Sequence, residues 1–366
     1  MRFISDLNSE HLEEINRLIN KKRYKNVAQF ISVAIENQLY LESTKVDEKQ
    51  KSRVDLFFSE NQYKEESKSG LNYEEIEISI KNTDPETVSP PKNNQIVIFP
   101  NGQIEDCWLW GQINRIFPIK LGLKILLSKL NNNVWIDLDE FRNEAAIIAG
   151  KYRQMIDELS NHKDLNRREI AAGLPIYYTK SGDDLKVENS MSRYKNQFLA
   201  FKRATDEKLG GALIDLKFVN IKNVNKGNKE KELIGITKAG LKFAQLFNPI
   251  INKQISRETL SDNEKNFYIN HIRENHIGEY KGTIWMLEKL NNGFSTRKSL
   301  NEELGKDYNN RWNLKKEVVN TQRAGLTARM TELGLIDKIK KGITVKYLIS
   351  EYGKEILKIN QKGDWK

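Results

Sequence analysis

The feature that most constrains this chain is a four-residue phrase, a small residue followed by Leu-Ile-Asp, which occurs twice. It stands at Ala212–Asp215 and again at Gly334–Asp337. Each copy is followed by an apolar-rich stretch, a break rich in Lys, Asn and Gly, and a second extended stretch. A helix-start pattern that carries a glycine comes next, "ITKAGLKFAQL" in the first copy and "LISEYGKEILKI" in the second. This repeated order of elements predicts two copies of one supersecondary unit.

The residues around the first copy predict helices followed by a hairpin. An apolar helix is expected from Ile119, with one or two further helices after it. A basic helix is expected at 190–211, where two glycines end it. Strands are expected at Leu213–Ile221 and Leu233–Ile236, and a closing helix begins at Thr237.

The second copy predicts the same elements in the same order. A capping box at Ser261–Glu264 starts its first helix. A basic helix at 320–333 precedes a hairpin at Leu335–Ile349, and a last helix follows at 350–359. In both copies the repeated phrase is interpreted as the turn from the basic helix into the hairpin. The small residue permits the turn, Leu and Ile enter the core, and Asp begins the exposed side of the strand.

The order helix, helix, basic helix and β-hairpin resembles the winged helix-turn-helix regulators. The resemblance is close over 270–360, where "TARMTELGLIDKIKKGITVKYLISEYGKEIL" matches the ends of many such regulators. It is weaker over 119–250, because the first hairpin is longer by about nine residues and an insert at 161–184 precedes the basic helix. The resemblance implies that the third helix lies in the DNA major groove and that the hairpin, or wing, touches the adjoining backbone.

Carried over position by position, the resemblance names candidate DNA-binding residues. The groove-facing candidates are Arg193, Lys195, Asn196, Gln197, Lys202 and Arg203 in the first copy, and Thr321, Gln322, Arg323, Thr327 and Arg329 in the second. The wing candidates for phosphate contacts are Lys222, Lys226, Lys229 and Lys231, and Lys338, Lys340 and Lys341. Arg can bind guanine, and Gln or Asn can bind adenine, through paired hydrogen bonds. The alternative is that these helices are plain solvated faces, since some winged helices bind proteins.

The distribution of charge favours a polyanion partner. The chain carries a formal net charge of +10. Residues 186–242 hold 13 basic and six acidic side chains, and so do residues 310–366, which gives +7 for each stretch. Residues 43–92 hold eight basic and eleven acidic side chains, or −3. The two stretches with the repeated phrase therefore carry the positive charge, as expected of a surface that binds nucleic acid.

The first 42 residues predict a short strand followed by two helices. So small a unit cannot bury a core alone and must dimerise or pack on something else. The block resembles the ribbon-helix-helix (Arc/MetJ-type) family, in which two chains pair their strands into a ribbon that enters the major groove. The resemblance implies a homodimer through residues 1–42, with Arg2 and Ile4 on the groove side of the ribbon. Asp6 departs from the family because a carboxylate near phosphates is unfavourable, so dimerisation is expected more firmly than base readout.

The remaining segments complete the expected organisation of an α+β, mostly helical chain. Residues 43–94 are highly charged and predict a linker. Residues 95–255 are expected to form an aromatic-rich segment and the first winged-helix domain, and residues 256–366 the second. The aromatic cluster includes Trp108 and Trp110, and such a cluster seals a small core more often than it stacks nucleobases.

The same residues argue against several other classes of protein. No apolar run approaches the roughly 20 residues that span a bilayer, and a single cysteine fits a reducing cytoplasm. The four histidines have no metal-ligand spacing, and no phosphate-binding loop occurs. Asp215-Leu216-Lys217 has the Asp-x-Lys form of metal-dependent nucleases, but the second copy does not keep it. We expect a cytoplasmic protein that is not an enzyme and needs no cofactor or metal.

These patterns favour a sequence-specific, homodimeric DNA-binding protein of a prokaryote or its mobile elements, most simply a transcriptional regulator. A plasmid or viral replication or partition factor is the alternative, since tandem winged helices also suit initiators that bind repeated sites. A protein-interaction adaptor or antitoxin-like protein is the second alternative, from a different class.

Overall fold

The structure is a computed structural model, and it describes residues 90–91 and 108–362, apart from short gaps, together with positions 16, 17, 19 and 27. The gaps are 132, 163–169, 180–181, 203–208, 227–228, 253–257, 313–315 and 343. The expected ribbon-helix-helix unit, with Arg2 and Ile4, therefore lies outside the described residues except at those four positions. Contacts along the chain define two compact units, Met1–Leu71 and Asn72–Lys366. The elements below all belong to the second unit.

The described chain is mostly helical with small antiparallel sheets, which confirms the expected α+β class. We call the elements within 117–245 the first repeat. Its elements are α6 (Phe117–Leu130), β1 (Ile136–Asp137), α7 (Leu138–His162), α9 (Asp184–Gln197), β2 (Phe201–Lys202), β3 (Leu209–Gly210), α10 (Ala212–Asp215), β4 (Val219–Lys226), β5 (Lys229–Ile236) and α11 (Lys238–Gln245).

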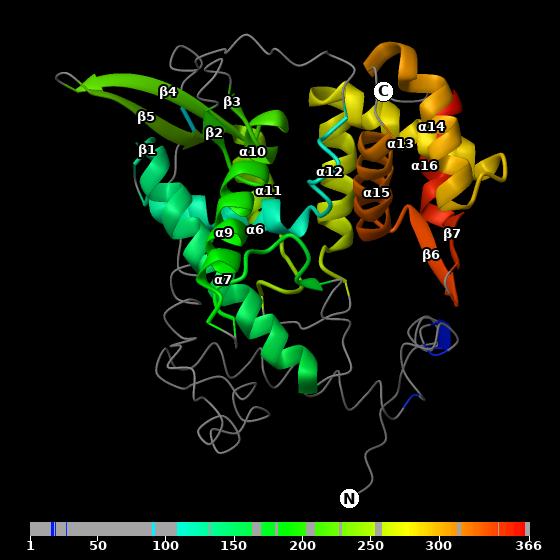
Figure 1. Ribbon diagram of the computed structural model, residues 1–366, viewed down its shortest axis with the longest axis horizontal. Coiled ribbons are helices and arrows are strands. Elements are labelled where there is room, and N and C mark those ends of the chain that lie inside the picture. The colour runs from blue at the N-terminus through cyan, green and yellow to red at the C-terminus, as the bar shows by residue number, and fades with distance from the viewer. Residues whose placement is uncertain are drawn as a thin grey trace, which may run out of the picture. The chain divides into compact units, whose positions relative to one another are not determined.

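We call the elements within 277–362 the second repeat, and α12 (Asp262–Asn275) lies between the two repeats (Figure 1). The second repeat contains α13 (Ile277–Asn291), α14 (Arg297–Trp312), α15 (Lys316–Glu332), β6 (Ile336–Lys341), β7 (Thr344–Ile349) and α16 (Glu351–Lys362). Each repeat places a short edge segment beside the second strand of its hairpin. β1 pairs with β5 in the first repeat, and Thr296 bridges to Lys346 of β7 in the second.

The basic helix expected at 190–211 is not continuous. Helix α9 ends at Gln197, because the apolar run that follows enters the core instead of continuing an amphipathic helix. The chain then forms the β2–β3 pair, and Gly211, at a φ of 103°, leads into α10. An added Cβ on Gly211 would overlap the carbonyl of Leu199, so the chain needs glycine for this close approach. The first copy of the repeated phrase, Ala212–Asp215, is therefore helical and does not begin a strand.

The residues that correspond in the two folded repeats are not the ones that the repeated phrase aligns. Lys217 and Gly334 both have a left-handed backbone, with φ values of 55° and 71°. Each donates its amide to the carbonyl three residues earlier, and the next residue, Phe218 or Leu335, donates to the carbonyl five residues earlier. This is the hydrogen-bond pattern of a Schellman helix end. Gly334 thus matches Lys217, five positions after Ala212, and the interpretation of "ALID" as the turn into the hairpin is wrong.

The correspondence of Lys217 with Gly334 also corrects the expectation that the first hairpin is longer by about nine residues. Strands β4 and β5 have eight residues each, and strands β6 and β7 have six each. Two residues join the strands in each hairpin. The first hairpin is therefore longer by two residues per strand, and the remainder of the expected nine belongs to α10 and its turn.

The helix after each hairpin begins in the same way, as the sequence predicts. Thr237 and Ser350 are the N-terminal caps of α11 and α16, and their hydroxyls accept the amides of Gly240 and Gly353. An added Cβ on either glycine would overlap the carbonyl oxygen of the residue that follows the left-handed turn. The two glycines in "ITKAG" and "ISEYG" therefore let the last helix lie directly against the turn into the hairpin.

Helix α12 joins the repeats through buried polar contacts. The Lys120 ammonium of α6 lies 2.9 Å from the Glu264 carboxylate of α12, and neither side chain is exposed. Burial lowers the pKa of Lys120 to about 8 and raises the pKa of Glu264. His271 of α12 contacts the Leu216 carbonyl at 2.6 Å and stacks on the Phe218 ring. The capping box expected at Ser261 and Glu264 is confirmed.

Residues 108–116, which we call the strap, run from α13 across α15 to the start of α6. Trp108 is buried against Trp285 and Tyr308, with ring centroids 5.6 and 5.0 Å away. An added Cβ on Gly325 of α15 would overlap the backbone of Gly111, so the strap lies directly on the helix. The aromatic cluster therefore belongs mainly to the core at Trp108, as expected, whereas Trp110 is 49% exposed.

Replacing Gly353 with Ala tests the close approach of α16 to the turn. The new methyl group would displace backbone, so we expect a loss of about 1–3 kcal/mol in the free energy of unfolding. Gly305 lies in the interior of α14 with open space around it, and Gly305→Ala should stabilise the protein by about 0.5–1 kcal/mol. Urea unfolding of both variants gives the two free energies. Equal effects of the same sign would contradict this packing.

Candidate nucleic-acid interface

Helix α15, which carries most of the expected groove-facing residues of the second copy, has one buried and one exposed side. Val319, Leu326 and Met330 are buried at helical spacing and fix the side that meets the core. The opposite side carries the exposed or half-exposed Glu317, Asn320, Thr321, Ala324, Ala328 and Thr331. These residues are small or polar, and we call them the α15 stripe.

Arg329 is not part of the α15 stripe. Its side chain is 1% exposed, and its guanidinium donates to the Glu279 carboxylate of α13 at 2.7 and 2.9 Å. The same carboxylate accepts the Leu109 amide at 2.9 Å, and Arg329 also donates to the Ile113 carbonyl of the strap. The expectation that Arg329 faces a groove is therefore wrong, because its charge is paired inside the protein.

Gln322 and Thr327 are also buried, with 7% and 2% of their surface exposed. The Thr327 hydroxyl donates to the Arg323 carbonyl one helical turn earlier at 2.9 Å. Gln322 lies beneath the strap, where Gly111 contacts it. The expectation is therefore wrong for Gln322, whereas the buried Thr327 lies in the wall of a hollow beside α15.

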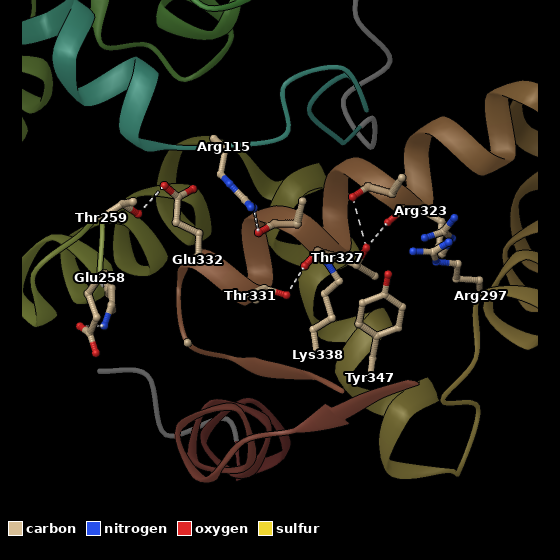
Figure 2. Close-up of a pocket in the computed structure, with 14 residues that line it drawn as sticks. Arg115, Glu258, Thr259, Arg297, Arg323, Thr327, Thr331, Glu332, Lys338 and Tyr347 are labelled. Carbon is tan, nitrogen blue, oxygen red and sulfur yellow. Dashed lines mark hydrogen bonds and ion pairs between the residues drawn. The ribbon is translucent and has the colours of Figure 1, made fainter. Parts of the chain in front are cut away.

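A hollow of about 550 Å³ lies beside the α15 stripe, and we call it the α15 hollow (Figure 2). Its walls come from the strap, the segment at 258–259, α12, the start of α14, α15 and the β6–β7 hairpin. Five cations and two carboxylates line it: Arg115, Lys265, Arg297, Arg323, Lys338, Glu258 and Glu332. Three of the residues expected from the sequence, Arg323, Thr327 and Lys338, are brought together here.

A second hollow, of about 760 Å³, lies beside α9, and we call it the α9 hollow. It brings together Arg193, Gln197 and Thr321, which were expected to act in different copies of the unit. Lys186 and Arg153 add positive charge, and the described lining residues include no carboxylate. The strap separates the hollows, since its Gln112 and Asn114 line the α9 hollow and its Arg115 lines the other.

The other candidates on α9 and β2 are placed differently. Lys195 donates to Asn143 of α7 at 3.0 Å, and Asn196 accepts from Arg142 of α7 at 2.7 Å. Both face α7 at the surface, outside the α9 hollow. Lys202 lies in β2, its side chain is outside the described part of the structure, and so is all of Arg203.

Two of the four candidate lysines of the first hairpin are engaged within the protein. Lys231 lies 3.2 Å from the Asp137 carboxylate, and the Lys222 ammonium lies 4.5 Å from the centre of the Trp135 ring. Lys226 and Lys229 are the last pair of the hairpin register, and the structure does not describe their side chains. On the second hairpin Lys338 and Lys340 are exposed, while the side chain of Lys341 is not described.

Arg297, Asn320 and Lys186 are among the residues of these surfaces that were not predicted from the sequence. Arg297 begins α14 directly after the cap residue Thr296, whose hydroxyl accepts the Ser299 amide. Asn320 lies on the α15 stripe and accepts from Asn301 at 2.6 Å. The helical spacing of Val319, Leu326 and Met330 indicates the buried face of α15, and the stripe is the opposite face.

Two other features, a metal site and a membrane-spanning helix, are absent from the described ranges. No group of three His, Cys, Asp or Glu side chains converges there as a metal site would require. No described helix combines the length and the apolar character that crossing a membrane requires.

Replacing Arg329 with Met tests its structural role. Glu279 would remain buried without its partner, so we expect a loss of about 3–5 kcal/mol in the free energy of unfolding. Lys129→Met is the control, because it breaks an ion pair with Glu144 whose side chains are 37% and 40% exposed, and such pairs contribute less than about 1 kcal/mol. Urea unfolding compares the two. A loss no larger than that of the control would place Arg329 outside the core.

Comparison with known proteins identifies no relative. No protein-family model matches the chain, and neither a curated protein nor a solved structure matches it. The inference of a function therefore depends on the α15 stripe and the two hollows beside it.

Proposed function

We propose that this chain is a sequence-specific double-stranded DNA-binding protein and that its two repeats act as winged helix-turn-helix units. The observation that carries the proposal is the position of the α15 stripe, which has a cation-lined hollow on each side. Arg193 and Lys186 line one hollow, and Arg297 and Lys338 line the other. An exposed helix flanked by positive charge fits a major groove, which has a phosphate backbone along each edge.

Within this proposal the residues divide between base readout and phosphate binding. The α15 stripe enters the major groove, where Asn320 hydrogen-bonds to adenine and Ala324 contacts a thymine methyl group. Lys338 and Lys340 of the β6–β7 hairpin bind the adjoining phosphates, which fix the register of the helix without reading sequence. Arg193 and Gln197 of α9 extend the contact surface into the first repeat.

The biological role that we propose first is that of a prokaryotic transcriptional regulator in the cytoplasm, paired into a homodimer through residues 1–42. Lysine-rich repeats and a neutral N-terminal block support this division between DNA binding and pairing. Two chains would then present four DNA-binding repeats to one operator.

A plasmid or viral replication or partition factor is the second candidate, and one observation favours it. The repeats differ in sequence, and the buried Lys120–Glu264 pair and His271 join them within one chain. Half-site symmetry in DNA mirrors symmetry in the protein. Two unlike repeats in fixed relation therefore suit an asymmetric site that recurs in one direction, as at an origin. Footprinting separates the roles, since a regulator protects promoters and an initiator protects repeated sites.

Replacing Lys338 and Lys340 with Ala tests the phosphate contacts. Each phosphate neutralised adds roughly 0.9 to the slope of log K against log salt. The slope should therefore flatten by about 1.8 for each bound chain, or about 3.6 for the homodimer, while sequence preference is kept. Lys358→Ala, on the exposed side of α16 and outside both hollows, is the control and should leave the slope unchanged. Fluorescence anisotropy at several salt concentrations gives the slopes. A double variant that binds as the parent does would remove the hairpin from the interface. Failure of the parent to bind any duplex at moderate salt would favour a protein-interaction adaptor or antitoxin-like protein.

A further inference from the structure

One end of the α15 hollow gathers positive charge from three elements. Arg297 comes from the start of α14, Arg323 from α15, and Lys338 and Tyr347 from the β6–β7 hairpin. Lys338 and Tyr347 are paired across the two strands, so their side chains share the face that looks toward α15. Figure 2 shows the guanidinium groups of Arg297 and Arg323 side by side, with the Tyr347 hydroxyl pointing up toward α15 beside them. We call these four residues the cationic corner.

Arg323 is the unusual member of the cationic corner because it is buried without a carboxylate. Only 7% of its surface is exposed, and its Nε donates to the Asn301 side chain at 3.0 Å. No ion pair joins it to a described acidic residue. Burial lowers the pKa of this guanidinium, Tyr347 raises it, and the like charge of Arg297 lowers it. A buried cation beside another cation is costly unless an anion joins them.

The carboxylates of the hollow do not meet this need, because other groups occupy them. Glu332 accepts the amides of Ile116 and Phe117 at 2.6 and 3.1 Å and so caps the start of α6. Glu258 lies 2.7 Å from the Lys265 ammonium. The positive charge of the cationic corner is therefore not balanced from within the hollow.

We propose that the cationic corner is a binding site for one phosphate group. This inference rests on the proposed function, under which the occupant is a single phosphodiester of the bound duplex. One planar guanidinium is enough for a carboxylate, whereas two guanidiniums, an ammonium and a phenol from three elements suit the several oxygens of a tetrahedral phosphate. Asn301 is a positioning residue, since it accepts the Nε hydrogen bond of Arg323, whose side chain lines the hollow.

A phosphate at this place would set the register of the α15 stripe on the DNA. Arg323 projects from the same helix as Asn320, and Asn301 contacts both, donating to Asn320 and accepting from Arg323. Binding of one phosphate therefore fixes the position of the base-reading side of α15 relative to the backbone.

The test compares Arg297→Gln with Lys298→Gln. The two positions are adjacent on α14 and exposed, and each change removes one positive charge, but the Lys298 side chain is 88% exposed and outside the hollow. In the first arm, duplexes carry one neutral methylphosphonate at each backbone position in turn. We expect one position to weaken binding of the parent by roughly tenfold or more, as the loss of a charge-assisted hydrogen bond does. That position should weaken binding of Arg297→Gln by a smaller factor, because one of its partners is already lost, and its full effect should remain in Lys298→Gln.

In the second arm, the thermal midpoint of the full chain is measured with inorganic phosphate and with chloride at equal ionic strength. We expect phosphate to raise the midpoint of the parent and of Lys298→Gln more than that of Arg297→Gln. Inorganic phosphate could raise the thermal midpoint as expected while no methylphosphonate position depends on Arg297. That result would support the site and would identify its occupant as a free phosphate or a phosphate monoester. Identical behaviour of the two variants in both arms would overturn the inference even if the parent binds DNA. No duplex binding by the parent, with phosphate stabilisation intact, would instead overturn the proposed function alone.

Discussion

The buried ion pair between Arg329 and Glu279 is the interaction on which the arrangement of the candidate interface depends. Two charges removed from water are tolerated only when further hydrogen bonds complete them. Here the strap supplies those bonds through the Leu109 amide and the Ile113 carbonyl. Helix α15 cannot rotate about its axis without breaking the pair, and rotation would also drive Gly325 away from the strap. The pair therefore determines which side of α15 faces outward.

The local elements of the second repeat were predictable because each has its own signal in the sequence. The capping box at Ser261, the β6–β7 hairpin and the helix after it all lie where their residues predict them. The repeated phrase gave a wrong alignment of the two repeats, because the same residues adopt different backbone conformations in the two copies. In the second copy the left-handed position is Gly334, and glycine is a recognisable signal for the end of a helix. In the first copy the same position is Lys217, a residue type that gives no such signal. Only the hydrogen bonds of the folded chain reveal that Lys217 and Gly334 correspond.

The candidate site was less predictable than the fold, because the charge of a side chain does not indicate which face of its helix it occupies. Arg329 and Arg323 look alike in the sequence, yet one pairs with Glu279 in the core and the other lines a hollow. The difference arises from residues far away in the chain, at 279 and in the strap, and no local pattern contains it. Arg297 was missed for the same reason, since its place beside Arg323 depends on how α14 packs against α15. The α15 stripe itself could be predicted from the helical spacing of the apolar residues of α15.

We propose that two unlike repeats, fixed to each other through α12, present one DNA-binding surface. Selection of bound duplexes from a random pool by the full chain tests this proposal. We expect enrichment of an asymmetric site whose two parts tolerate no change in spacing. This site should occur once in each duplex, or twice at a variable distance. Enrichment of a single short palindrome, or two parts that bind equally well at any separation, would contradict the proposal.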